Sequence, residues 1–269
     1  MNPESKALVL SPELRFLAPT AVDDLIRIGS AEDGGYVVPR SVVPDVDFLL
    51  SFGVNVDWSF DEDLKRLNPA IGIHAYDFSV GPRVFWSQAI VGVVKALLGI
   101  IPFAECRQRI RKIDGYRQFF SKHATHFRER INDRKELPYD VTLDEVFART
   151  QSEHIFLKMD IEGSEYAVMP DVLRHAARVK AIAIEFHAIN THRREFIDAM
   201  AQLQTVFELV HLHANNYEGA APDGLPDVLE LTFVKVAGAR VAPRRTTLPL
   251  PGLDAPNHPT LPDFTISFT

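Results

Sequence analysis

Short apolar runs alternate with amphipathic stretches along most of the chain. Residues 45–53, 71–77, 154–160 and 181–187 form four such runs, each apolar almost throughout. This pattern is typical of strands that are buried on both faces. Strands that alternate with helices predict a mainly parallel sheet covered on both faces by helices.

Helices are predicted between these strands. Ser59 with Glu62, and Thr142 with Glu145, have the spacing of capping boxes, which places one helix start near Phe60 and another just after Thr142. Residues 162–176 and 194–207 are apolar at helical spacing.

Two further apolar runs lie close to the end of the chain, at 207–213 and 227–236. Only the polar loop 214–226 separates them, so they are predicted to pair as an antiparallel hairpin. The fold class predicted is α/β: a Rossmann-like, doubly wound, mainly parallel seven-stranded sheet that closes with an antiparallel β hairpin. A helical basic insert is expected beside it, and residues 1–269 are expected to form a single domain.

The insert, residues 83–135, departs from this pattern. It holds twelve Lys and Arg residues against four Asp and Glu, in a chain whose net charge is −7. Its first part is apolar around a narrow stripe formed by Gln88, Gly92, Lys95 and Gly99 on a helix. The run is too short for a membrane span and is interrupted by Lys95. A lid over a site, a dimer interface and a membrane-surface element are all compatible with it.

The tail, residues 242–269, is also irregular, since it holds six of the 18 prolines. We expect an extended strap over the surface and not an independent domain.

Composition narrows the class of protein. The chain has 269 residues, of which 46% are hydrophobic and 24% charged, as in ordinary soluble globular proteins. The negative net charge argues against a general nucleic-acid binder. The single cysteine, Cys106, cannot form an internal disulfide or a cysteine metal cage, which favours a reducing compartment. The N-terminus lacks a signal-peptide pattern, so we expect a cytoplasmic protein, with membrane-peripheral attachment as an option.

Polar residues gather where the predicted strands end. In open α/β sheets the ligand lies outside the carboxyl ends of the strands, so these residues are the candidates for chemistry. They are Gly53, Asn55, Asp77, Asp160, Glu185, His187, His211 and His213.

Three features at these ends suit a nucleoside. Gly53 allows close approach of the backbone to a ligand, although a tight turn explains it equally. Asp77 is placed to accept the hydroxyls of a ribose, with a solvated aspartate as the plain alternative. Tyr36 belongs to the segment DGGYVV, which is typical either of a loop folding over a ligand or of a simple β turn.

The segment LKMDIEGSEY is the most specific feature of the sequence. It places Asp160, Glu162 and Glu165 directly after a buried strand. Three acids in such a place are costly unless a positive group meets them, such as the sulfonium and amino group of S-adenosylmethionine (SAM) or a metal ion. For Glu165, a role in favouring a helix N-terminus is the alternative.

Two histidines complete the candidate site. A hydroxyl group that accepts a methyl group benefits from a base, and His187 or His213 titrates in the useful range. With Asp160 and Glu185 they are alternatively candidate ligands of a divalent cation such as Mg²⁺. Either histidine on its own is also typical of a hydrogen-bonded core residue.

Together these segments resemble the FkbM-like family of class I SAM-dependent methyltransferases. The resemblance rests on RIGSAEDGGYVVP, LLSFGVNVDWSFDEDL, HAYD, LKMDIEGSEY and HLHANN…DVLELTF…GLDAPN, from about Arg27 to the tail, with only the basic insert unmatched. It implies O-methylation, often of sugars in surface glycans or of natural products. It also implies that Gly53 and Asp77 contact SAM and that Asp160 is the active-site acid beside the methionine end. Asn55 and Phe78 depart from the family pattern, since a glycine and a polar residue are usual there.

The sequence therefore predicts a SAM-dependent O-methyltransferase acting on a small-molecule or glycan hydroxyl. Asp160, His187 and His213 are the catalytic candidates, and the cofactor contacts are expected from Tyr36, Gly53, Asn55, Asp77, Asp160 and Glu162. The basic insert suits an acceptor that carries phosphate or is linked to a lipid, and it also suits a homodimer contact.

Two other classes of protein remain as alternatives. A nicotinamide-dependent oxidoreductase would need a G-x-G-x-x-G turn after the first strand, and SFGVNVD lacks one. A non-catalytic glycan-binding or scaffold protein on a methyltransferase fold is the other.

Overall fold

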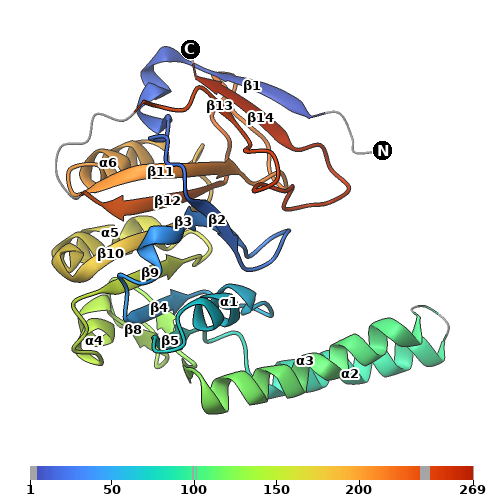
Figure 1. The fold of residues 1–269 in the computed structure, drawn as a ribbon. Helices are drawn as coiled ribbons and strands as arrows, with labels where there is room; N and C mark the ends of the chain where they lie inside the picture. Colours follow the sequence, from blue (N-terminus) through green and yellow to red (C-terminus); the bar gives the residue numbers. More distant parts are fainter. Residues whose placement is uncertain (1–4, 99, 101, 237–242, 269) are drawn as a thin grey trace.

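A seven-stranded sheet forms the centre of the protein (Figure 1). The computed structural model describes residues 5–98, 100, 102–236 and 243–268. The strand order is β11-β12-β10-β9-β4-β5-β6, and β12 alone runs antiparallel to its neighbours. The strands are β4 (Phe48–Phe52), β5 (Gly72–Tyr76), β6 (Thr125–Phe127), β9 (Ile155–Met159), β10 (Val179–Phe186), β11 (Phe207–Ala214) and β12 (Leu229–Lys235). The predicted fold class is confirmed, including the closing hairpin of β11 and β12.

Both faces of the sheet are covered, because alternate residues of each strand point to opposite sides. Leu50 and Leu157 pack into a cluster with the helices α4 (Leu143–Ala148), α5 (Glu165–Arg174) and α6 (Arg193–Leu203). Their neighbours Leu49 and Phe156 pack on the other face against α1 (Ser59–Leu67) and the hairpin of β2 (Leu25–Ile28) and β3 (Tyr36–Pro39). The continuous apolar runs in the sequence are explained by this burial on both sides.

The two predicted capping boxes have different outcomes. The Thr142–Glu145 box is present at the start of α4, where the backbone N–H of Thr142 donates to Glu145 Oε2 at 3.2 Å. The Ser59–Glu62 box is wrong: Ser59 is already the first residue of α1, and Glu62 Oε1 instead accepts a hydrogen bond from the indole of Trp58 at 2.8 Å. Asp57 Oδ1 accepts the backbone N–H of Ser59, so a nearer acid takes the capping role.

The basic insert contains a hairpin of two long helices, α2 (Pro82–Leu97) and α3 (Phe103–Lys122), which projects from the body (Figure 1). Its end supplies the edge strand β6, which the sequence analysis did not assign, and β7 (Arg130–Ile131), which pairs with β8 (Asp140–Val141). The insert is therefore helical, as expected, in its first part and a part of the sheet in its second.

The two ends of the chain meet in a second, small sheet. Its order is β1-β14-β13, built from β1 (Lys6–Leu10), β13 (Thr247–Leu248) and β14 (Phe264–Phe268). Short 3₁₀ turns occur at Pro12–Leu17, Arg40–Val42 and Ala176–Arg178. The expected strap is thus anchored at both ends by strands, and between them Asp254 and Asn257 contact His211 and Glu230 of the β11–β12 hairpin.

Candidate active site

A cavity of about 180 Å³ opens at the carboxyl ends of β4, β5 and β9. Gly53, Asp77 and Asp160 follow these strands directly, and all three line the cavity. The convergence of strand ends expected from the sequence is therefore observed for these residues. The remaining lining residues are Asn55, Tyr76, Phe78, Ser79, Glu129, Arg130, Ile131, Ile161, Glu162 and Ser164.

Gly53 is required by a neighbouring strand and not only by a ligand. Its φ is 73°, and a Cβ at this position would lie 1.5 Å from the carbonyl oxygen of Asp160. The ammonium group of Lys158, a buried side chain, donates to the carbonyl oxygen of Gly53 at 3.0 Å. Because of this close approach, the ends of β4 and β9 are fixed against each other.

Two other residues of the cavity wall adopt left-handed backbone conformations. Asn55 has a φ of 48° and Glu162 a φ of 56°. Asparagine adopts this conformation more readily than other non-glycine residues, which explains how it replaces glycine in the first turn. For Glu162 the conformation is strained, and such strain concentrates at functional sites.

The carboxylate of Asp77 is held from two sides. Its Oδ2 accepts the backbone N–H of Asn55 at 2.7 Å, and its Oδ1 accepts the N–H and hydroxyl of Ser79 at 2.8 and 2.6 Å. A carboxylate has about four acceptor positions. One of them remains for a ligand hydroxyl, and a second becomes free if the Ser79 hydroxyl turns away.

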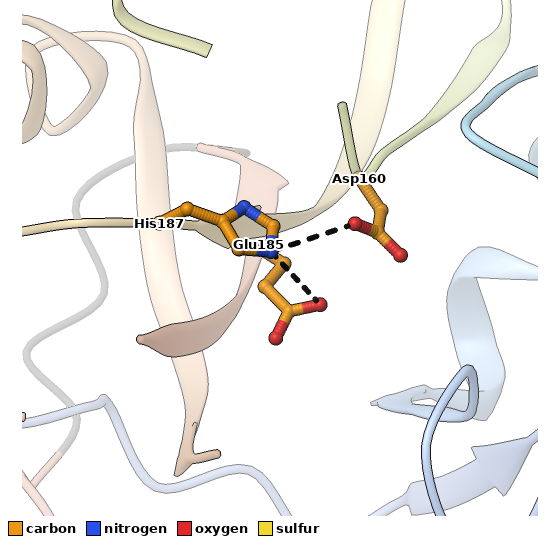
Figure 2. A group of neighbouring side chains, drawn as sticks. All are labelled: Asp160, Glu185 and His187. Atoms are coloured by element: carbon orange, nitrogen blue, oxygen red, sulfur yellow. Dashed lines mark ion pairs between the residues drawn. The ribbon is translucent and has the colours of Figure 1, made fainter. Parts of the chain in front are cut away.

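An acidic cluster surrounds His187 next to this cavity (Figure 2). The Nε2 atom of His187 lies 3.8 Å from Asp160, 3.7 Å from Glu162 and 3.9 Å from Glu185. On the other side of the ring, Nδ1 lies 3.1 Å from Glu165 Oε1, which also accepts the N–H of Ile161. Glu165 therefore does more than favour the start of α5: it fixes the orientation of His187.

The titration of these groups is shifted by burial and by their mutual charges. Burial raises the pKa of Asp160 to about 6, although the positive charges of Lys158 and His187 act against this shift. Burial and the charge of Asp160 raise the pKa of Glu185 well above its ordinary value. Burial lowers the pKa of His187, but the hydrogen bond to Glu165 and the charge of Glu185 outweigh it and raise that pKa to about 9. Near neutral pH, His187 is thus a cation and Asp160 is mostly an anion.

His213 has a different environment from the one its sequence position suggests. It is 2% exposed, its Nδ1 lies 3.3 Å from Glu230, and its Nε2 lies 3.4 Å from Asp263 of the tail. Burial lowers its pKa, but the hydrogen bonds to Asp263 and Glu230 outweigh this effect and raise it to about 10. His213 does not line the cavity and carries a positive charge near neutral pH. His211 is likewise buried, paired with Asp254 at 3.1 Å.

Tyr36 also lies away from the cavity wall. It begins β3, packs edge-on against Phe60 with 5.7 Å between ring centroids, and is 2% exposed. Burial, with the charges of Asp160 and Glu185, raises the pKa of its hydroxyl well above the usual value. Tyr36 therefore lies near the acidic cluster, and its contact with a cofactor stays a prediction.

The sequence analysis assigns no role to several residues of the site. Lys158 is one of them, and Asn215 is another: its amide donates to Glu185 at 2.7 Å. Asn257, in the tail, donates to Glu230 and to Asp33. The asparagines belong to the motifs HANN and GLDAPN, which carried the family resemblance, but their partners are distant in sequence.

Among the described residues, two groups of side chains have the donors of a cation site. They are Asp160, Glu185 and His187, and Asp33, Glu185 and Glu230, and within each group the candidate ligand atoms lie within 4.8 Å of one another. Carboxylate oxygens suit hard cations such as Mg²⁺, and imidazole suits transition metals. The buried Glu185 belongs to both groups.

A larger cleft of about 1150 Å³ lies at the opposite edge of the sheet. It is lined by residues near the amino ends of the parallel strands, among them Asp45, His154 and Lys180. Ligands of doubly wound sheets bind at the carboxyl edge. We therefore assign the site to the smaller cavity, where the strand-end acids meet.

Residues 109–218 match the family model of the methyltransferase FkbM domain. Over this segment the chain is similar to the methyltransferase FkbM domain. The matched segment contains Asp160, Glu185 and His187, whereas Gly53 and Asp77 precede it. The match begins within α3, so part of the basic insert belongs to the matched segment, contrary to the expectation that the insert is unmatched.

Solved structures with a similar fold include two proteins of low identity. The precorrin-6y C5,15-methyltransferase of Geobacter metallireducens GS-15 is 15% identical, with 73% of this chain and 87% of that chain covered and a TM-score of 0.35. The fibrillarin pre-rRNA processing protein of Methanococcus jannaschii is 9% identical, with 72% and 68% covered and a TM-score of 0.38. No curated protein sequence matches this chain.

A methyltransferase of this fold implies SAM as the methyl donor, and the donor set of the cavity fits it. Asp77 offers an acceptor for a ribose hydroxyl, and Asp160 with Glu162 offers negative charge for the cationic end. The volume is below the roughly 300–1000 Å³ of typical ligand pockets. At the wall of the cavity, the ring of Phe78 stacks on Tyr139 with 4.9 Å between centroids.

Proposed function

We propose that this protein is a SAM-dependent O-methyltransferase acting on a hydroxyl of a sugar, a glycan or a hydroxylated natural product. The observation that carries the proposal is the position of the cluster of Asp160, Glu185 and His187. It adjoins the cavity in whose wall Asp77 and Asp160 both lie. A nucleoside contact and a proton-accepting cluster are therefore next to each other.

The cofactor, when bound, supplies an electrophilic methyl group on a sulfonium. Asp77 would hold the ribose, and Asp160 and Glu162 would face the cationic end. The acceptor hydroxyl would approach from the side of His187. Much of the rate would come from alignment of the two reacting groups, since orientation alone can supply about 7–11 kcal/mol.

Asp160 is the group best suited to take the proton of the acceptor hydroxyl. Its pKa of about 6 leaves it ionised, yet still basic, near neutral pH. His187 is already protonated there, because its pKa is about 9. It therefore acts as a positioning residue whose charge is held beside Asp160 by Glu165. The sequence analysis predicted that a histidine acts as the base, whereas this proposal assigns that role to the carboxylate of Asp160.

A divalent cation is the second way in which the same cluster would activate a hydroxyl. Asp160, Glu185 and neutral His187 would then hold the ion, which would supply Lewis acidity toward the acceptor hydroxyl. The two versions differ in their response to a chelator. They share the same residues and the same methyl donor.

The test combines binding and turnover on the full chain. S-adenosylhomocysteine should raise the melting temperature and NAD should not. SAM with a panel of sugars, nucleotide sugars and lipid-linked glycans should give a methylated product, read by mass spectrometry, with and without Mg²⁺ and EDTA. Loss of turnover in EDTA assigns the cation version, and retention assigns the Asp160 version.

Asp160→Ala should abolish turnover in a folded protein. Asp198→Ala is the matched control, because Asp198 is an exposed aspartate on α6 whose side chain is 63% accessible. No response to S-adenosylhomocysteine would refute the proposal and favour a glycan-binding scaffold. A response to NAD instead would favour an oxidoreductase.

A further inference from the structure

The helical hairpin of α2 and α3 is anchored at one end only. At its base Phe85 and Tyr116 are buried and pack edge-on against Trp58, with 5.8 Å between each pair of ring centroids. The other end projects away from the body (Figure 1). Packing with the core therefore explains the base of the hairpin and leaves its tip unexplained.

The tip exposes large apolar side chains. Leu98 is 69% exposed, Ile100 63% and Phe103 65%. In the sequence, residues 96–104 include no charged side chain. Seven of the 16 large apolar side chains that are exposed in the described part of the chain lie on this hairpin: Ile90, Val91, Val93, Leu98, Ile100, Phe103 and Ile110. Exposed apolar side chains that concentrate on one element in this way mark a contact with a partner or a membrane.

Positive charge flanks this apolar tip. Residues 82–122 hold eight Lys and Arg residues against two acidic ones, a net charge of +6 in a chain of net charge −7. Lys95 lies on the α2 side of the tip, and Arg107 and Arg111 lie on the α3 side, all three exposed. Their long side chains can reach past an inserted tip to the lipid phosphates.

We infer that the tip of this hairpin docks on an anionic membrane surface. The apolar side chains would enter the boundary between head groups and acyl chains, while the basic side chains pair with anionic head groups. None of the described helices has the length and apolar character needed to cross a bilayer, so docking at the surface is the form that fits. A second copy of the chain fits less well, since two hairpins of charge +6 repel each other.

Docking of the tip would tether the body to the membrane, with the hairpin standing between the lipid and the candidate site. The chain leaves α3 into β6 and then reaches Glu129 and Arg130, which line the cavity. The hairpin and the cavity wall are therefore joined by a few residues. The inference itself rests on the hairpin and not on the proposed methyl transfer, so the failure of one leaves the other standing.

Sedimentation of the full chain with lipid vesicles tests the inference. The protein should pellet with vesicles of phosphatidylcholine and phosphatidylglycerol, pellet much less with phosphatidylcholine alone, and be released by high salt. Arg107→Gln and Arg111→Gln should each weaken binding about fivefold, the effect expected for one basic residue near an anionic surface. Arg194→Gln is the matched control, because Arg194 is 93% exposed on α6.

Phe103→Asp tests the apolar part of the tip and should abolish vesicle binding. Ile197→Asp is its control: it replaces an exposed apolar residue on α6 and should leave vesicle binding unchanged. Leu98→Ser provides a milder second variant if Phe103→Asp fails to fold by circular dichroism. Equal binding to neutral and anionic vesicles, or none to either, overturns the inference. A dimer in sedimentation velocity that Phe103→Asp dissociates, without vesicle binding, assigns the tip to a second copy of the chain.

Discussion

Replacing Asp160 by asparagine should stabilise the protein while it removes turnover. The amide has nearly the shape of the carboxyl group but carries no charge. The pKa of Asp160 is raised to about 6 by burial, which means that the folded protein disfavours the ionised form. Catalysis needs that form, so stability and activity should move in opposite directions.

The magnitude follows from the shift. A rise from 3.8 to about 6 corresponds to about 3 kcal/mol of destabilisation at pH values well above 6. The side chain keeps 22% of its accessible surface, so part of this cost is relieved by water. We therefore expect Asp160→Asn to raise the free energy of unfolding by about 1–3 kcal/mol at pH 7.5, or the melting temperature by about 2–10 °C.

The pH dependence provides the check on this reasoning. A carboxyl whose folded-state pKa is raised contributes stability that is complete below its unfolded pKa and is lost as the pH rises through the folded value. The extra free energy of unfolding of the variant over the wild type should therefore fall to about half by pH 5 and vanish near pH 3.5. Urea denaturation of Asp160→Asn, wild type and the control Asp198→Asn at three pH values measures it. A destabilised variant at pH 7.5, or an advantage that does not depend on pH, would refute the reasoning.

Three further variants test the site and the packing around it. Gly53→Ala should lower the free energy of unfolding by several kcal/mol, because the new Cβ meets the carbonyl of Asp160 in a left-handed turn. It should also abolish binding of S-adenosylhomocysteine in calorimetry. Unchanged binding would contradict the tight packing of β4 against β9. His213→Gln should lower the free energy of unfolding by about 3–5 kcal/mol, since Glu230 and Asp263 lose a buried cationic partner. Wild-type stability should decline as the pH rises from about 6.5 towards 10, and this slope should flatten in the variant. Asp77→Asn should weaken the binding of S-adenosylhomocysteine at least tenfold, which corresponds to about 1.4 kcal/mol, with little loss of turnover at saturation. An unchanged dissociation constant would remove Asp77 from the cofactor site.

Most strands of the sheet, its closing hairpin and the position of the site could be predicted because their signals are local. Burial on both faces makes each strand of the parallel sheet an apolar run, and the absence of a helix between 213 and 227 fixes the closing hairpin. Gly53, Asp77 and Asp160 follow from the same pattern, since each comes directly after a strand and parallel strands end at one edge. The Thr142–Glu145 box succeeded for the same reason: both partners lie within one turn.

The charges and roles within the site were decided by residues distant in sequence. The state of His187 depends on Glu165 and Asp160, which precede it by more than twenty residues, and that of His213 on Glu230 and on Asp263 from the tail. Gly53 is required because the carbonyl of Asp160, which follows a different strand, approaches its backbone. The sequence by itself determined which residues reach the edge of the sheet, because strand periodicity is a property of neighbouring residues. Only the tertiary structure decided which of them carry protons, because burial and electrostatic contacts arise when separate segments pack together.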